Sequence, residues 1–342
     1  FTTINNGSLF MNTKLYTGDS ASSRTIAGIG FEPSLTWNKP RTTANDHQWV
    51  DAVRGGGKVI SSNLADAEYT AGNTILSFNS DGFTCGDGAS VNANGVDYVS
   101  WNWKANGAGS ANTDGSINTT YTSANTTAGF SIIKYAGTGS SGTIGHGLSA
   151  TPKVLIIKEI DGTESWRVWH RDAPNYSTTA LSLNSSSAEF SQTNWIGTVD
   201  NSIITLGTDS SINTSGNNYI CYAFAEKQGF SKFSSYTGNG NNDGSFIYTG
   251  FSTAFVMTKN IGATENWAIW DNKRIPFNAN TTILRADSAN AETSGYSVDF
   301  VSNGFKLRGG DGKINGTGAS YIYMAFAEAP IVGTNNIPAN AR

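Results

Sequence analysis

Similar strings of residues recur three times along this chain, in the same order and at nearly the same spacing. The clearest string is NANGVDYVSWNW, which returns as NTSGNNYICYAF and NGTGASYIYMAF and aligns Tyr98, Tyr219 and Tyr321. Two other residue types keep the same order: Lys39, Lys158 and Lys259, and Glu68, Glu189 and Glu292. A repeat of this length exceeds a solenoid unit, so we predict that each copy is a domain with its own core.

These landmarks set the domain boundaries that we expect. The chain divides into copy one at 1–105, a linker at 106–128, copy two at 129–228, copy three at 229–329 and a tail at 330–342. The linker is rich in Gly, Ser, Asn and Thr, a composition typical of flexible connectors. The tail is polar, and Pro330 and Pro338 disfavour a central strand there, because proline lacks the N–H that a ladder needs.

Short runs with strand character follow turn signals in each copy. YICYAF and YIYMAF place apolar and aromatic side chains on both faces of a strand, and a Gly that can adopt positive φ precedes each of them. KVLIIKEI and FVMTKNI are further short runs of the residue types that favour strands. Helical spacing of apolar residues never persists over three turns. We therefore predict an all-β chain of three tandem antiparallel β-sandwich repeat domains, jelly-roll-like in form.

Composition argues against several classes of protein. Charged residues make up 14% of the 342 residues, the net charge is −4, and no basic run occurs, so we expect no nucleic-acid partner. No apolar run approaches the ~18 residues of a membrane helix, so we expect no membrane insertion. The two cysteines, Cys85 and Cys221, fall at non-equivalent positions of the repeat and are expected to be buried free thiols.

Acidic residues that recur between copies are the first candidates for chemistry. They are Asp51 and Asp271, each after a Trp-containing run, and Glu68, Glu189 and Glu292 downstream. Paired carboxylates can hydrolyse glycosides. However, Arg54 and Arg274 lie between the acids, which favours ion pairs within each copy. We predict that the chain is not an enzyme and has no catalytic residues.

Other polar and aromatic residues give weaker signals. Oxygen-bearing side chains that could hold calcium, at Asp81, Asp87, Asn92, Asp209 and Asn213, lack the alternating acidic loop of a calcium site and are predicted to form turns. We expect no metal and no cofactor. Most tryptophans are expected to fill cores, but one on a loop could stack on a sugar, and Trp169, Trp195 and Trp270 are the candidates.

The repeated strings resemble a β-domain of marine bacteriophages. YICYAFAEKQGFSKFSSYTGNGNNDGSFIYTGF, DFVSNGFKLR and YIYMAFAEAP carry the resemblance, which extends from Tyr16 to Pro330. The domain occurs in cyanophage-like and pelagiphage-like tail, tail-fibre and other virion structural proteins. The resemblance implies localisation in the virion, outside the cell, and other virion proteins as partners. It also implies a homo-oligomer, for which we expect a trimer, and it brings no catalytic site.

Two hypotheses for function follow. The first is a non-enzymatic tail-fibre or appendage component that binds host-surface glycans, where several weak sites on one chain would gain through multivalency. The alternative is a head or tail decoration or assembly protein that binds only other virion proteins, by adding strands to its neighbours. The sequence leaves the choice between them open.

Overall fold

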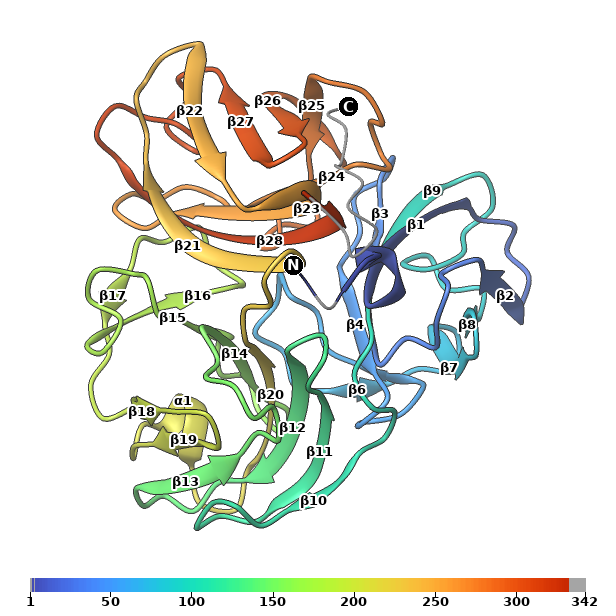
Figure 1. The fold of residues 1–342 in the computed structure, drawn as a ribbon. Helices are drawn as coiled ribbons and strands as arrows, with labels where there is room; N and C mark the ends of the chain where they lie inside the picture. Colours follow the sequence, from blue (N-terminus) through green and yellow to red (C-terminus); the bar gives the residue numbers. More distant parts are fainter. Residues whose placement is uncertain (1, 3, 332–342) are drawn as a thin grey trace.

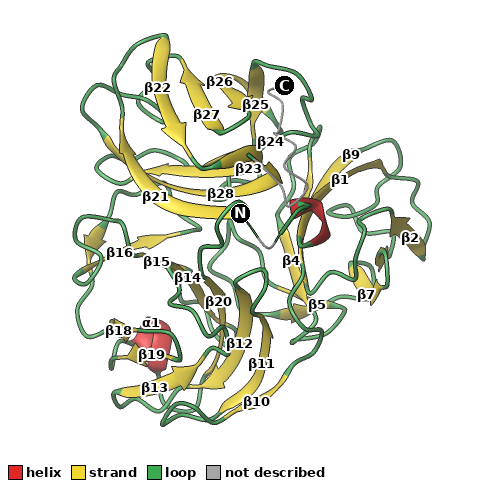
Figure 2. Cartoon of the chain, in the orientation of Figure 1, coloured by secondary structure: helices red, strands yellow, loops and turns green. Residues whose placement is uncertain are grey.

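The computed structural model describes residue 2 and residues 4–331, and nearly all of its regular structure is β (Figures 1 and 2). This confirms the predicted all-β class. Two short helices interrupt the strands, η1 (Gly7–Leu9) and α1 (Ser210–Asn213). Neither of the helices in the described part of the chain could span a membrane.

Copy three is a sandwich of two four-stranded antiparallel sheets. The inner sheet has the order β21 (Ser231–Thr237), β28 (Ser320–Pro330), β23 (Phe251–Asn260) and β24 (Ala268–Asp271). The outer sheet has the order β22 (Asp243–Tyr248), β27 (Gly304–Arg308), β26 (Thr293–Val301) and β25 (Asn280–Ile283). Early and late strands lie side by side, β21 with β28 and β22 with β27, which is a jelly-roll feature.

Copies one and two follow the same plan with smaller outer sheets. Copy one has the inner order β1 (Met11–Thr17), β9 (Asp97–Trp103), β3 (Leu35–Pro40) and β4 (Gln48–Asp51), the outer order β2 (Arg24–Ala27), β8 (Gly82–Cys85) and β7 (Ile75–Asn79), and a separate pair, β5 (Lys58–Val59) and β6 (Tyr69–Thr70). Copy two has the inner order β12 (Phe130–Ala136), β20 (Asn218–Phe224), β14 (Val154–Glu159), β15 (Arg167–His170), β16 (Thr179–Ser182) and β17 (Phe190–Ser191), and the outer order β13 (Gly142–Gly145), β19 (Ile203–Leu206) and β18 (Ile196–Val199).

The last long strand of each copy, β9, β20 or β28, lies in the middle of its inner sheet and begins near the landmark tyrosine. Tyr98, Tyr219 and Tyr321 have no exposed surface. Each ring stacks on a tyrosine of the neighbouring strand, in the pairs Tyr16–Tyr98, Tyr135–Tyr219 and Tyr236–Tyr321. Each hydroxyl donates to a backbone carbonyl before the strand, at Ala89, Ser210 or Gly312. The repeated tyrosine therefore fixes the turn that precedes the strand.

The segment 106–128 is not the flexible linker that its composition predicted. It contains β10 (Ser110–Asn112) and β11 (Thr119–Asn125), and β11 pairs with β12 to extend the inner sheet of copy two. Between them, Ile117 N donates to Thr143 O at 2.9 Å on the outer strand β13. The segment thereby covers two sheet edges, whose unpaired N–H and C=O groups need partners. Polar β-capable residues such as Thr suit this edge position.

The predicted tail begins inside the last strand. Pro330 is the last residue of β28 and lies opposite Phe251 of β23. At this end β28 pairs with β23 alone, because its pairing with β21 stops at Phe326. The missing N–H of proline therefore disrupts no ladder of a central strand. Residues 332–342, including Pro338, lie outside the described part of the chain.

A central core joins the three copies. Copies one and two also have hydrophobic clusters of their own, as predicted, whereas the core of copy three is continuous with the central one, so the expectation of a separate core is wrong for copy three. Trp49 of copy one packs edge to face on Trp166 and Tyr222 of copy two, at ring-centroid distances of 5.1 and 4.9 Å. Trp103 of copy one packs in the same way on Phe326 of copy three at 5.8 Å. The central strands of the inner sheets are buried on both faces, so each inner sheet needs cover from its outer sheet and from the other two copies. Figure 1 shows the three inner sheets around this centre.

Candidate functional site

Arg54 joins the two recurring acids of copy one in a buried network. Its Nε lies 2.5 Å from Asp51 Oδ2, and its Nη1 lies 3.2 Å from Glu68 Oε2. Asp51 also accepts a hydrogen bond of 2.7 Å from the Tyr222 hydroxyl of copy two. Burial opposes the charge of Arg54, but the neighbouring Asp51 carboxylate raises the pKa of the guanidinium above its usual value. The network therefore joins copies one and two.

Copy three repeats this network with a different partner. Arg274 Nε lies 2.6 Å from Asp271 Oδ2, and Arg274 Nη1 lies 3.2 Å from Glu292 Oε1. Trp101 of copy one donates from Nε1 to Asp271 at 3.0 Å. Burial alone would raise the pKa of Asp271, but Arg274 and these hydrogen bonds hold it below the usual value. Glu292 also binds Arg41 of copy one at 2.8 Å.

Copy two replaces the charged pair with a neutral residue. His170 stands in the position of the aspartate and Ala173 in that of the arginine. The His170 Nε2 lies 3.2 Å from Tyr323 O of copy three, and burial lowers the pKa of this imidazole to about 4. Glu189 bonds the Thr179 hydroxyl at 3.0 Å and has no ion pair among the described residues.

These contacts confirm the prediction of ion pairs within copies one and three. The side chains of Asp51 and Asp271 have no exposed surface. Their oxygens bind backbone or side-chain groups of the protein, so the acids serve the junctions between copies.

The three tryptophans proposed to stack on a ligand are buried, so that prediction is wrong for them. Trp169, Trp195 and Trp270 are 1%, 2% and 0% exposed. Trp169 and Trp195 fill the core of copy two, and Trp270 Nε1 donates to Tyr296 O at 2.8 Å. The sequence pattern could not distinguish a buried tryptophan from an exposed tryptophan that stacks on a ligand, because both kinds occur beside polar residues.

The candidate calcium ligands hold turns. Asn92 donates to Asp19 Oδ1 and to Ala21 O, and Asn213 donates to Ser140 O and Gly207 O. Asn315 of copy three is equivalent to both and makes similar bonds to the loop at 239–241. Asp81 accepts from two backbone N–H groups, and Asp209 caps α1. Across the described residues no group of three His, Cys, Asp or Glu side chains could hold a metal ion.

The cysteines behave as the sequence predicted. Cys85 and Cys221 are free and buried. Burial raises the pKa of the Cys85 thiol to about 11 and that of Cys221 further. Both thiols therefore stay protonated near neutral pH, as core residues do.

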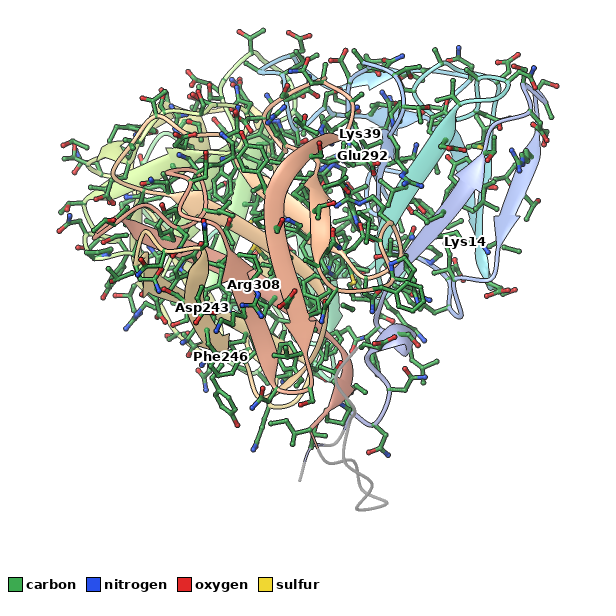
Figure 3. The ribbon with its side chains drawn as sticks, turned by 90° about the horizontal axis from the view of Figure 1, so that it is seen from above. Lys14, Lys39, Asp243, Phe246, Glu292 and Arg308 are labelled. Carbon is green, nitrogen blue, oxygen red and sulfur yellow. The ribbon has the colours of Figure 1, made fainter. Side chains whose placement is uncertain are left out.

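An aromatic pair on the outer sheet of copy three is the best candidate for a binding site. Phe246 and Tyr248 are 49% and 60% exposed, whereas Ile247 between them is 6% exposed and packs inside the sandwich. Alternation along β22 places both rings on the outer face. Phe246 lies opposite Lys306 on β27, and Tyr248 lies opposite Gly304, which has no side chain to cover the ring. Figure 3 shows Phe246 projecting from the molecule.

Charged side chains flank the aromatic pair. Asp243 binds Lys306 at 2.6 Å and Arg308 at 2.9 Å, and Arg308 also binds Asp299 at 2.6 Å. The hydrogen bond and charge of Lys306 lower the pKa of the Asp243 carboxyl. Figure 3 shows Asp243 and Arg308 close to Phe246. Two cations and two carboxylates therefore offer donors and acceptors beside the rings without a net charge.

Copies one and two have no aromatic residue at these positions. The buried isoleucine of the edge strand defines the register, since Ile26, Ile144 and Ile247 lie opposite Phe83, Ile204 and Phe305. By this register Phe246 corresponds to Thr25 and Thr143, and Tyr248 corresponds to Ala27 and Gly145. Sequence analysis missed the pair, although aligning SFIYTG with the other copies would have shown two aromatic residues in place of small ones.

The chain belongs to a family defined by a domain of unknown function, DUF7483, whose model matches residues 6–330. The match spans all three copies and the segment between copies one and two. A search of curated proteins finds no match to the chain.

Proposed function

We propose that this chain is a non-enzymatic virion protein, a tail-fibre or appendage component, that binds host-surface glycans through Phe246 and Tyr248. The virion assignment rests on the resemblance of the repeated strings to phage structural domains. The aromatic pair supports the glycan assignment, since copy three alone replaces small residues with two exposed rings at one position of the fold.

The chemistry of the patch suits a sugar. An exposed aromatic ring offers rigid, amphipathic contact area to the C–H face of a pyranose at low entropic cost. The adjoining carboxylates and cations of Asp243, Lys306 and Arg308 can exchange hydrogen bonds with hydroxyl groups. One such patch would bind weakly, so several chains on a virion would raise the effective affinity.

Glycan-array binding tests the proposal, with purified chain displayed at several copies per particle. The double variant Phe246→Ala, Tyr248→Ala should lose binding, because it removes both stacking surfaces. Tyr121→Ala is the matched control, since Tyr121 is also an exposed aromatic, at 41%, on a strand of another part of the fold. Equal glycan binding by the double variant and the wild type would contradict the proposal.

One observation favours the assembly function as a second candidate. Within the described residues, strand β22 pairs only with β27, so its other edge is free for strand addition by a neighbouring protein. In copy two, Ile117 bonds the equivalent strand. If the wild type binds no glycan but the double variant fails to join virion particles, the patch is an assembly surface.

A further inference from the structure

A polar recess lies where the first strand of copy one meets copy three. Its volume is about 230 Å³, which leaves room for several water molecules at roughly 30 Å³ each. Asn12 and Thr13 of β1 line one side, Asn272 and Lys273 line another, and Glu328 of β28 also contributes. The recess is separate from the residues of the aromatic pair.

Two buried polar side chains that line this recess have no partner among the described residues. Asn272 is 2% exposed, and neither its amide nitrogen nor its amide oxygen has a hydrogen-bond partner. Thr13 is 6% exposed, and its hydroxyl also has none. Buried polar groups in folded proteins are nearly always hydrogen-bonded, so three unsatisfied atoms at one recess indicate a missing partner.

The repeat shows that both polar residues are specific to this place. Thr13 lies opposite Trp101, and the equivalent residues of the other copies are Ile132 and Phe233, opposite Tyr222 and Met324. The smaller threonine therefore leaves volume that an apolar side chain fills elsewhere.

Asn272 departs from the repeat in the same manner. It directly follows Asp271, in the position that Ala52 holds after Asp51 and Arg171 holds after His170. All three residues keep one backbone bond, from N to the carbonyl of Ala254, Ser34 or Lys153. The backbone pairing is therefore the same in the three copies, and copy three alone has an asparagine side chain at this position.

We propose that this recess binds a small neutral polyhydroxy compound, such as a single hexose ring. The Asn272 amide needs one acceptor and one donor, the Thr13 hydroxyl can take either, and vicinal hydroxyl groups supply both functions. Lys273 and Glu328 contribute one charge of each sign to the lining, so no net charge favours an ion. The inference does not depend on the aromatic pair of β22.

Saturation-transfer NMR with glucose, galactose, mannose and inositol as separate probes tests this inference on the full chain. We expect saturable transfer from at least one probe. Thr13→Val and Asn272→Ala should each weaken its binding by about tenfold or more, since each removes hydrogen-bonding atoms from an enclosed site. Thr13→Ile, which installs the residue of copy two, should weaken binding at least as much, because it removes the hydroxyl and also narrows the recess.

Controls keep the outcome clear. The three variants remove unsatisfied groups, so their melting temperatures should equal or exceed that of the wild type, which shows that they fold. The Phe246→Ala, Tyr248→Ala variant should keep recess binding, so failure of the proposed function and failure of this inference are distinguishable. The measurement is repeated on a chain that ends at Ile331, so that residues 332–342 cannot compete with the probe for the recess. The inference is overturned if neither the full-length chain nor the chain ending at Ile331 shows saturable transfer from any probe. It is also overturned if Thr13→Val and Asn272→Ala bind the probe as well as the wild type does. Either outcome means that the recess holds water only.

Discussion

The junctions that copy one makes with copies two and three each contain a buried arginine, Arg54 or Arg274, whereas the described residues at the junction of copies two and three include none. All three junctions nonetheless share one backbone bond, which joins Glu68 N to Ile160 O, Glu189 N to Ile261 O and Glu292 N to Arg41 O at 2.8, 2.8 and 2.9 Å. They also share a ring N–H bond, in which Trp166, Trp267 or His47 contacts a carbonyl of the adjacent copy.

This difference shows which contacts define the arrangement. The backbone and ring bonds are constant, so they set how the copies meet. The aspartate–arginine pair is replaceable by a neutral histidine, in agreement with the small net contribution of many buried ion pairs. Once such a pair is present, however, removing one partner leaves a buried charge without compensation, and the two kinds of junction should respond differently to mutation.

The largest effect is expected from the arginines. Arg274→Met or Arg54→Met should reduce the free energy of unfolding by about 3–5 kcal/mol, because each leaves a buried aspartate unpaired. Urea denaturation followed by tryptophan fluorescence measures the loss. Replacing both partners, as in Asp271→Asn, Arg274→Met, should be less harmful than the single arginine change. A loss under about 1 kcal/mol for both single variants would show that these pairs are not the source of the difference.

The contact between copies one and two comes next. Tyr222→Phe removes the hydroxyl that donates to Asp51 at 2.7 Å and should cost about 1.5–3 kcal/mol, the range for a hydrogen bond to a charged group. The control is Tyr121→Phe, whose ring is 41% exposed and whose change should be nearly neutral. Equal midpoints in urea for Tyr222→Phe and the wild type would refute the role of this bond.

His170 should make the junction of copies two and three sensitive to acid. Its folded pKa of about 4 lies below the 6.5 of a free histidine, so the unfolded chain binds the proton first, and stability present above pH 6.5 is lost as the pH falls toward 4. The loss reaches up to about 1.4 kcal/mol per pH unit for this group. His170→Gln should flatten the pH dependence of the unfolding midpoint between pH 6.5 and 4. An unchanged slope would contradict the assignment.

The smallest effect should come from the unpaired glutamate. Glu189→Gln should change stability by less than about 0.5 kcal/mol, since the carboxylate bonds only neutral groups and is partly exposed. Glu292→Gln should cost more, because Glu292 binds both Arg41 and Arg274. Thermal melts of the two variants at pH 7 make the comparison. Equal losses would show that the ion pairs of Glu292 contribute nothing beyond those neutral bonds.

Local pattern predicted much of the fold. The tyrosine strings gave the central strands and their burial, and the spacing of Arg54 and Arg274 between acids gave the ion pairs, because each depends on residues close in sequence or on the repeat itself. Sequence pattern failed at 106–128, where composition suggested flexibility but free sheet edges recruited strands. It also failed for Trp169, because burial depends on which face of a sheet a neighbouring element covers.

The sequence by itself determined that the chain belongs to the all-β class and that the strands YICYAF and YIYMAF are apolar on both faces. Only the tertiary structure decided what covers the second face, namely the inner sheets of the other two copies around one shared core. It likewise decided that Phe246 and Tyr248 face outward and that Asn272 and Thr13, which are far apart in the chain, line the same recess. Apolar periodicity specifies that one face of a strand must be buried. Because the hydrophobic effect is not directional, the pattern does not specify which surface covers that face. The close packing of whole sheets decides it.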